Sequence, residues 1–317
     1  MVTYNVETGP GPDRKKRTRA GFLYGFGAYG LWGLLPLYFV LLLPATAYEI
    51  VAMRVLFSVL FCLILLAVTK SLGTLVQLFR DGKAVIALVI AGVLIATNWL
   101  LYVVATTTGH TLEASLGYFI NPIVAVLLGV IVLREKLRPL QWAAIIVGFL
   151  AVLVMSVFYG SVPWLSLALA FSFGFYGLVK STIGGRYPAL VTLTGETAAI
   201  APLALAAVFY LNSDGQVTLF SEGAGHFWLL ASSGIITAVP LLLFGSAAAR
   251  LPLSTVGMIQ YVAPIGQFIL ALTVLDESMP LERWIGFGIV WCAVLLMILD
   301  AVRAPRARRL QRKRDAA

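Results

Sequence analysis

Long runs of apolar residues, each about the length of a membrane-spanning helix, recur along almost the entire chain. A helix needs about 20 apolar residues to cross the roughly 30 Å of hydrocarbon in a bilayer. Runs of this length, bounded by charges, prolines and glycine clusters, predict ten spans. They are residues 21–43, 47–69, 84–107, 112–133, 140–158, 161–181, 190–211, 227–249, 254–275 and 281–302. The pattern therefore predicts an all-α integral membrane protein.

Composition supports this prediction and excludes several classes of protein. Of 317 residues, 60% are hydrophobic and only 12% are charged, whereas soluble domains carry roughly 25% charge. A cytosolic enzyme, a disordered regulator and a nucleic-acid-binding module are therefore excluded. The net charge of +9 comes from basic tails at 1–20 and 303–317 and from short loops. Basic runs beside a membrane normally anchor to anionic lipid, so we expect the lipid bilayer, and no nucleic acid, as their partner.

The positions of lysine and arginine predict the orientation of the chain. If the amino terminus lies inside, 21 of these residues fall in cytoplasmic segments, whereas only Arg283 falls in an outer loop and Arg54 within a span. Short loops rich in lysine and arginine stay in the cytoplasm. We therefore expect a multi-pass protein with both termini cytoplasmic and no cleaved signal peptide.

An internal repeat relates the two halves of the chain. An offset of 142 residues aligns Pro122 with Pro264, Glu135 with Glu277 and, among others, Trp142 with Trp284. Each span then corresponds to the fifth span after it, so matching helices cross the membrane in opposite directions. The sequence predicts two inverted five-helix repeats, 21–158 and 159–302, between the two tails. Inverted repeats are typical of transporters that work by alternating access, with a binding site between the halves.

Prolines predict two helix breaks, at Pro122 in the fourth span and at Pro264 in the ninth. Proline cannot donate a hydrogen bond to the carbonyl four residues earlier, so Tyr118 and Gln260 should present freed backbone oxygens. Pro36 frees the carbonyl of Trp32 in the same way. Such an oxygen either faces a cavity or is satisfied by a neighbouring helix at a packed kink.

Polar and aromatic residues mark one face of several spans. Glu113 and Asn121 share a face of the fourth span with Gly117, and similar bands occur on the first, third, sixth and ninth spans. A polar stripe on a membrane helix should face inward, although aromatic rings also form interfacial belts. The candidate cavity residues are Tyr29, Trp32, Asn98, Trp99, Tyr102, Glu113, Ser115, Tyr118, Asn121, Tyr176, Gln260, Tyr261 and Gln267.

Four charged residues within spans are candidates for function, because charge is costly in a membrane. Glu49 and Arg54 lie in the outer part of the second span. Their charged ends either snorkel to the lipid headgroups or pair with other residues inside the protein. If Arg54 pairs inside, the expected partner is Glu113. Glu113 and Glu196 are candidates for a carboxylate that binds a proton or touches substrate. Lys180 is expected at the interface.

Enzyme chemistry has little support in the sequence. The chain has two histidines and two cysteines, without metal-ligand spacing, and no phosphate-binding loop. We expect no metal, no cofactor and no enzymatic activity. Without an ATP-binding segment, uphill transport would depend on a gradient, for which protons are the candidate coupling ion.

Several segments resemble a known family. Two corresponding segments resemble the EamA type of the drug/metabolite transporter superfamily. They are Leu133-Arg134-Glu135 with Trp142 in the first half and Leu275-Asp276-Glu277 with Trp284 in the second half. The segments 98–102 (NWLLY), 112–122 (LEASLGYFINP) and 171–178 (FSFGFYGL) are similar to its RarD branch, the chloramphenicol-sensitive proteins. The likeness covers residues 21–302.

The resemblance implies a permease of the bacterial plasma membrane that exports a small metabolite or drug-like molecule. It also implies a central cavity lined by the first, third, fourth, sixth, eighth and ninth spans. The family's usual Leu-Gly-Glu ending of the fourth span reads Leu133-Arg134-Glu135 here, and the ninth span ends Leu275-Asp276-Glu277, so we expect Glu135 and Glu277 to be loop structure. The alternative is a non-transporting membrane enzyme or a lipid-handling accessory protein, which would need a catalytic cluster at one membrane face. For the oligomeric state, the sequence is compatible with both a monomer and a homodimer.

Overall fold

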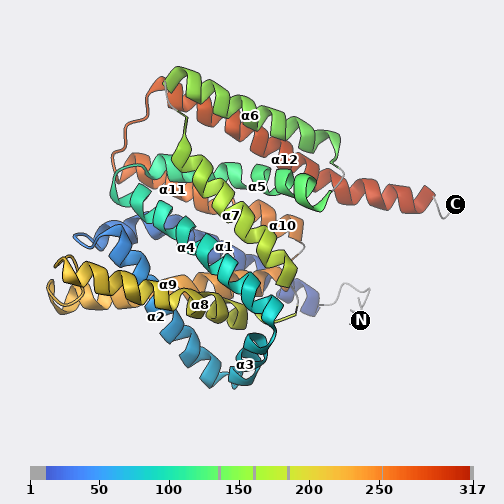
Figure 1. The fold of residues 1–317 in the computed structure, drawn as a ribbon. Helices are drawn as coiled ribbons and strands as arrows, with labels where there is room; N and C mark the ends of the chain where they lie inside the picture. Colours follow the sequence, from blue (N-terminus) through green and yellow to red (C-terminus); the bar gives the residue numbers. More distant parts are fainter. Residues whose placement is uncertain (1–11, 135–136, 160–161, 184–185, 252, 315–317) are drawn as a thin grey trace.

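Twelve helices form the fold in a computed structural model that describes residues 12–134, 137–159, 162–183, 186–251 and 253–314 (Figure 1). They are α1 (Pro12–Leu41), α2 (Ala47–Val68), α3 (Leu72–Arg80), α4 (Gly82–Thr107), α5 (Thr111–Leu133), α6 (Pro139–Tyr159), α7 (Trp164–Ile183), α8 (Ala189–Ser213), α9 (Gly223–Ala248), α10 (Leu253–Ile259), α11 (Val262–Thr273) and α12 (Leu281–Arg314). Glu135, with the outer parts of both tails, lies outside the described residues.

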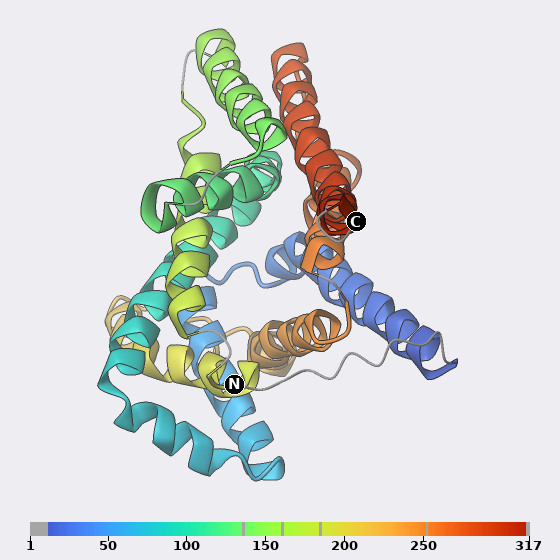
Figure 2. The ribbon, with the colours of Figure 1, turned by 90° about the vertical axis from the view of Figure 1, so that its right-hand side faces the viewer.

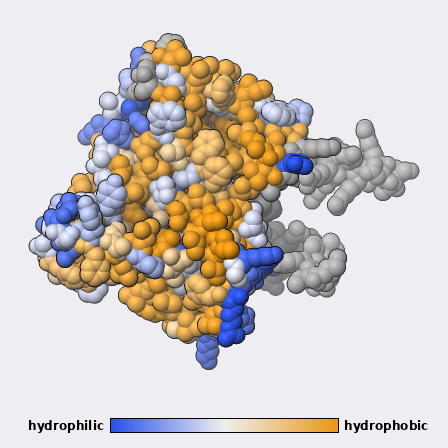
Figure 3. All heavy atoms as spheres, viewed as in Figure 1, coloured by the Kyte–Doolittle hydropathy of each residue, from blue (hydrophilic) through white to orange (hydrophobic). Residues whose placement is uncertain are grey.

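Within the described residues, ten segments are long and apolar enough to cross a membrane, as the hydropathy pattern predicted. Large apolar side chains remain on the exterior, with Val157 70% exposed and Phe209 76% exposed. In Figure 3 apolar residues cover the middle of the visible face, and hydrophilic residues gather towards two opposite ends. Such an exterior suits a lipid environment. The chain is a multi-pass membrane protein.

Local signals set several helix ends. Thr46 precedes α2, and its hydroxyl accepts a hydrogen bond from the Glu49 backbone N–H at 3.2 Å. Asp81 does the same for α4, where its carboxylate accepts from Lys83 and Ala84, both at 3.2 Å. Arg134 ends α5 in the left-handed conformation, with φ of 54°. These caps satisfy backbone groups that the helix ends leave unpaired.

The structure adds one element that the span pattern did not predict. α3 follows α2 after a short turn and is too short to cross a membrane. Leu75 and Leu78 on one of its faces are buried, whereas Arg80 at its end is exposed. A short amphipathic helix of this kind suits the interface between protein, headgroups and water.

The helices pack in a regular set of pairs. α5 packs on α7 and α11, α4 on α7 and α8, α1 on α9 and α11, and α2 on α8 and α9. α6 and α12 pack on each other and lie side by side at one end of the molecule in both ribbon views (Figures 1 and 2). The spans that carry most of the candidate residues therefore surround one another, with α6 and α12 towards one edge.

The two prolines that predicted helix breaks behave differently. The ninth span is interrupted at Gln260 and Tyr261, which separate α10 from α11, and Pro264 follows in the first turn of α11. α5, in contrast, continues from Thr111 to Leu133 with Pro122 inside it. The predicted break at Pro122 is wrong, because one missing hydrogen bond does not end a helix that packs closely against α7 and α11.

Candidate functional site

Asn98 joins three helices through its side-chain amide. Its Nδ2 donates to the Leu169 carbonyl and to the Ser172 hydroxyl of α7, both at 3.0 Å. Its Oδ1 accepts a hydrogen bond of 3.0 Å from the Tyr118 hydroxyl of α5. Asn98 is only 1% exposed, so these bonds replace water completely. The amide therefore fixes α4 against α5 and α7 and holds the Tyr118 ring in place.

Aromatic rings of α1, α4, α5 and α7 continue from this point. Tyr102 lies edge-on to both Tyr118, at 5.5 Å between ring centroids, and Phe39, at 5.8 Å. Phe173 lies edge-on to Tyr118 from the other side, at 6.1 Å. The Tyr102 hydroxyl is buried and has no hydrogen-bond partner. Predicted residues on the third and fourth spans thus meet in one aromatic cluster.

Arg54 of α2 lies against this cluster and does not reach Glu113. Its Nε donates to the Thr237 hydroxyl of α9 at 2.8 Å, and its guanidinium lies over the Trp99 ring, 4.2 Å from the centroid. Arg54 is 4% exposed, so it does not snorkel to headgroups either. The prediction of an Arg54–Glu113 pair is wrong, because the packing of α2 on α9 turns the side chain towards Thr237.

Glu113 instead pairs at the start of α5 with Arg283 of α12, at 3.8 Å. Nearby, the Glu277 carboxylate accepts hydrogen bonds from the backbone N–H groups of Thr111 at 2.5 Å and Leu112 at 2.9 Å. Glu277 thus caps α5 and has the structural role in a loop that the sequence suggested. These contacts join α5 to α12 and to the loop after α11 at one end of the bundle.

Glu49 is buried and bound by the loop after α8. Its carboxylate accepts from the backbone N–H groups of Thr218 at 2.8 Å and Leu219 at 2.9 Å, and from the Thr218 hydroxyl at 2.9 Å. The snorkelling alternative is wrong for Glu49, which is fully buried. A carboxylate whose oxygens are occupied in this way anchors a loop to α2.

Glu196 of α8 forms the center of a polar group at the other end of the bundle. Lys180 of α7 forms an ion pair with its Oε1, and the Tyr176 hydroxyl donates to its Oε2 at 3.1 Å. Lys180 also bonds the Thr192 hydroxyl at 3.1 Å. Glu196 is fully buried. Lys180 was expected at the interface, but the packing of α7 brings its amine inward to this carboxylate.

A further group of predicted residues surrounds α1. Gln267 of α11 donates from Nε2 to the Trp32 carbonyl at 3.2 Å, so a neighbouring helix satisfies the oxygen that Pro36 frees. Tyr29 and Trp32 contact each other at 5.1 Å between centroids, and both contact Phe244 of α9 at 6.1 Å. The Gln267 Oε1 is buried and has no partner.

The fourth and ninth spans meet through Ser115, whose hydroxyl donates to the Pro264 carbonyl at 2.9 Å. Gln260 precedes this contact, and its freed carbonyl accepts locally from the Ala263 N–H at 3.3 Å. Tyr261 stacks on Phe119 at 6.3 Å within an apolar cluster shared with α12. About one turn after Tyr118 on α5, the Asn121 Oδ1 is buried without a partner.

The predicted residues therefore form several groups instead of one continuous wall. Asn98, Trp99, Tyr102 and Tyr118 come together, whereas Tyr176 with Glu196 and Trp32 with Gln267 lie in neighbouring groups, and Glu113 lies at one end. Sequence reasoning missed Thr237, Lys180 and Arg283 as partners. Thr237 carries no signal in sequence, since threonines occur in many spans, but Lys180 and Arg283 were visible as charges beside apolar runs.

Ten apolar helices with polar and charged side chains paired between them define a multi-pass integral membrane protein. The EamA-like transporter family matches residues 19–157. Protein RarD of Streptomyces exfoliatus is 46% identical over 301 residues, covering 94% of each chain. Protein RarD of Escherichia coli is 38% identical over 294 residues, covering 92% of this chain and 98% of its own length. The chain belongs to the EamA-like transporter family, in its RarD branch.

Another relative and one solved structure are also similar to this chain. The uncharacterized transporter YojE of Bacillus subtilis is 40% identical over 294 residues, covering 92% of this chain and 97% of its own. One solved crystal structure, described only as that of a protein, shares the fold with a TM-score of 0.57 at 18% identity, covering 90% of this chain and 99% of the other. The family and the names of these relatives identify a membrane transporter.

Proposed function

We propose that this protein is a secondary active transporter that exports small metabolites or drug-like compounds by alternating access across the bacterial inner membrane. Its two inverted repeats would exchange conformations, so that a site between them opens to one side and then the other. The observation that carries this proposal is the correspondence between helix contacts in the two halves. Export as the direction rests on the family resemblance alone.

Exchanging the halves maps the helix pairs onto one another. In the proposed repeat, α1, α2, α4, α5 and α6 correspond to α7, α8, α9, α10–α11 and α12. The contact of α4 with α7 then corresponds to that of α9 with α1, and α5 with α7 to α11 with α1. Likewise α2 with α9 corresponds to α8 with α4. A two-fold relation of this kind allows two conformations of equal packing quality, which alternating access requires.

Close approaches of glycines support the same relation. A Cβ on Gly92 of α4 would lie 2.8 Å from the Glu196 carbonyl oxygen of α8, and a Cβ on Gly234 of α9 would overlap the Phe57 carbonyl of α2. Gly92 and Gly234 are the repeat-related pair at the offset of 142 residues. Both are places where only glycine lets two helix backbones meet.

Polar contacts between the halves lie at both ends of the bundle. Glu113–Arg283 joins α5 to α12 at one end, and Asp81–Arg186, at 3.9 Å, joins the start of α4 to the turn before α8 at the other. We infer that the site opens to one side when the ion pair at that end breaks while the ion pair at the opposite end stays formed. The distribution of lysine and arginine supports placing the Asp81 end, together with both termini, in the cytoplasm. α1 begins and α12 ends on the same side of Figure 1.

Protons are our proposed coupling ion, with Glu196 as their binding carboxylate. Glu196 is fully buried in a span and contacts both a lysine and a tyrosine, so gain or loss of its proton would change the pairing of α7 with α8. Glu113 is the weaker candidate, since it is 26% exposed at the end of α5.

Asn121→Leu tests whether the fourth span lines the path. The Asn121 Oδ1 is buried without a protein partner, so its removal should leave the fold intact while substrate loses a hydrogen bond. We expect transport to fall about tenfold or more, roughly 1.4 kcal/mol. The measurement compares metabolites and toxic compounds inside and outside cells that express wild type, the variant or no transporter.

Two controls accompany this experiment. Asn212→Leu makes the same change at an exposed position at the end of α8 and should leave transport unchanged. Asn98→Leu removes the bonds to Leu169, Ser172 and Tyr118 and should lower thermal stability, which Asn121→Leu should not. Full transport by Asn121→Leu would exclude the fourth span from the path, and no shifted compound with wild type would contradict the transporter proposal.

A further inference from the structure

Arg54 is a buried cation whose guanidinium is only partly satisfied. It is the eighth residue of the 22-residue α2, and it is 4% exposed. Nε donates to Thr237, and the planar group lies over Trp99 at 4.2 Å and Phe39 at 5.6 Å from the ring centroids. Nη1, however, is buried and has no hydrogen-bond partner.

Arg54 has no carboxylate partner among the residues that the structure describes. The ion pairs found there use Arg138, Lys180, Arg186 and Arg283 as cations. The ionisable groups close enough to act on Arg54 are the phenols of Tyr38, Tyr102 and Tyr118. An arginine stays charged, and a buried charge is destabilising unless it is paired. The aromatic contacts offset only part of that penalty. An anion from outside the chain would therefore complete the site.

Three buried hydroxyl groups without partners lie on α2, α4 and α9, the helices that carry or contact Arg54. The Tyr102 hydroxyl is buried and unpaired, and Tyr102 contacts Phe39, one of the two rings beneath Arg54. The Ser58 hydroxyl, one helical turn from Arg54 on α2, and the Ser233 hydroxyl, one turn from Thr237 on α9, are also buried without partners. These groups are donors, as is Nη1. A carboxylate, with two oxygens and about four lone-pair directions, matches such a set of donors.

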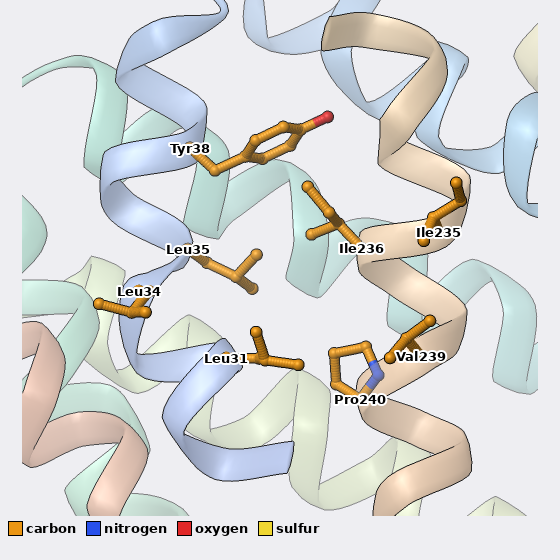
Figure 4. A pocket seen from close by; sticks show the side chains of 8 residues that line it. All are labelled: Leu31, Leu34, Leu35, Tyr38, Ile235, Ile236, Val239 and Pro240. Carbon is orange, nitrogen blue, oxygen red and sulfur yellow. The ribbon is translucent and has the colours of Figure 1, made fainter. Parts of the chain in front are cut away.

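An apolar groove runs beside this cluster between α1 and α9 (Figure 4). Its volume is about 240 Å³, and apart from Tyr38 only aliphatic side chains and Pro240 line it. Tyr38 and Ile236 line the groove, whereas the residues directly after them, Phe39 and Thr237, contact Arg54. Consecutive residues on a helix point about 100° apart. The groove and the guanidinium therefore contact neighbouring faces of α1 and α9, one residue apart on each helix.

The other half of the chain shows what a satisfied charge looks like at this position. The offset of 142 residues aligns Arg54 of α2 with Glu196 of α8. Glu196 has a cation within the chain, Lys180, and a hydroxyl donor, Tyr176. Arg54 has the hydroxyl acceptor Thr237 and lacks an anion among the described residues. At this aligned position, Glu196 thus has a partner of opposite charge and Arg54 has none among the described residues.

We infer that Arg54 binds the carboxylate of a small apolar organic acid, whose apolar part occupies the groove between α1 and α9. This inference rests on the proposed function, because the acid would be the transported substrate. In the present conformation the guanidinium is closed off, and rocking of the halves would expose it. Thr237 and Trp99 would orient the guanidinium so that Nη1 and the free hydroxyls face the carboxylate.

Thermal unfolding of the purified protein in nanodiscs tests this inference. The probes are benzoate, phenylacetate and hexanoate, each compared with its neutral amide, and acetate as a carboxylate without an apolar body. A ligand that binds only the folded state raises the melting temperature. We expect at least one of the three apolar acids to raise it by about 2 °C or more, with little effect from its amide or from acetate.

Arg54→Met should abolish this shift, whereas Arg80→Met, the same change at an exposed residue of α3, should retain it. Without ligand, Arg54→Met should melt no lower than wild type, because it removes an unpaired buried charge; a purely structural arginine predicts the reverse. If Arg54→Met does not fold, Arg54→Lys serves instead and should need about tenfold more acid for the same shift, because lysine lacks the planar fork.

Three results would overturn the inference: no shift of wild type by any of the acids, an equal shift by the amides, or an undiminished shift in the Arg54 variant. Counterflow of labelled benzoate into liposomes at pH 8 tests transport independently of binding, so that failure of the acid-binding site and failure of the proposed function can be distinguished. Binding that depends on Arg54 without flux would contradict transport and keep the site. Export of neutral compounds from cells without acid binding would keep transport and reject the site.

Discussion

At the scale of single residues, buried polar groups divide into those that hold helices together and those that lack partners. Asn98 and Glu49 have three hydrogen bonds each, to other helices or loops. Arg54 Nη1 and Asn121 Oδ1 have none. In a membrane no water replaces a missing bond, so groups of the second kind are the places where a ligand adds most. Glu196 is fully bonded, yet its partners are themselves ionisable.

Glu196→Gln should uncouple transport from protons at this scale. The amide retains the size of the side chain but cannot gain or lose a proton, and it removes the charge that pairs with Lys180. We expect transport driven by an imposed pH gradient to fall about tenfold, whereas exchange of substrate across liposomes continues. Glu113→Gln, at the exposed pair with Arg283, should keep the gradient dependence. The reverse pattern would assign coupling to Glu113.

At the scale of elements, small residues decide how closely helices approach. Gly234 places α9 directly against the backbone of α2 at Phe57 and Ser58, one turn from the Thr237–Arg54 contact. Gly117 does the same for α5, where a Cβ would lie 2.7 Å from the Ser166 carbonyl of α7. Gly30 and Gly177, in contrast, have no atom within 4 Å of the position a Cβ would take. The same residue type therefore has opposite consequences at different positions.

Gly234→Ala should destabilise the protein by about 1–3 kcal/mol, because the added methyl overlaps backbone atoms that cannot move aside. Gly177→Ala in α7 is the matched control, since no atom lies within 4 Å of its Cβ position; it should be neutral or stabilising by up to about 1 kcal/mol. Unfolding in detergent titrations measures both. Equal effects of the two variants would show that the contact between α2 and α9 is looser than the structure describes.

At the scale of the whole molecule, ion pairs between the two proposed halves lie at both ends of the bundle. Glu113–Arg283 and Asp81–Arg186 are both formed, at 3.8 and 3.9 Å. Alternating access requires that one end opens while the other stays closed. In the proposed mechanism, the described conformation is therefore one in which both contacts are formed and Arg54 is buried.

Reversible cross-links test this directly. In a Cys62→Ser, Cys292→Ser background, the pairs Glu113→Cys with Arg283→Cys and Asp81→Cys with Arg186→Cys should each be joined by a bis-methanethiosulfonate reagent long enough to replace the two side chains that meet there. A direct disulfide would need closer backbones. Either cross-link should reduce transport more than tenfold, because it fixes one end of the bundle, and reduction should restore it. Single-cysteine variants should keep transport after the same treatment. Undiminished transport with either cross-link formed would argue against alternating access between these ends.

The sequence alone determined the class of protein, its ten spans and its family. A bilayer demands about 20 apolar residues per helix and internal backbone hydrogen bonding, so span number follows from local pattern without knowledge of packing. The family follows from motifs such as the NWLLY segment at 98–102. The sequence also predicted that the polar faces of the third and fourth spans turn inward, and Asn98 and Tyr118 on those faces bond to each other.

Only the tertiary structure decided which residues meet. From sequence, Arg54 and Glu113 formed a plausible pair, yet Arg54 lies on Thr237 and Trp99, and Glu113 pairs with Arg283. Pro122 stays within α5, whereas the ninth span is interrupted before Pro264. The physical reason is that apolar helices have no strong preference for one neighbour or rotation. Close packing at a few glycines and polar groups fixes both, and several of these contacts, such as Arg54–Thr237 and Gly234–Phe57, join residues more than a hundred positions apart.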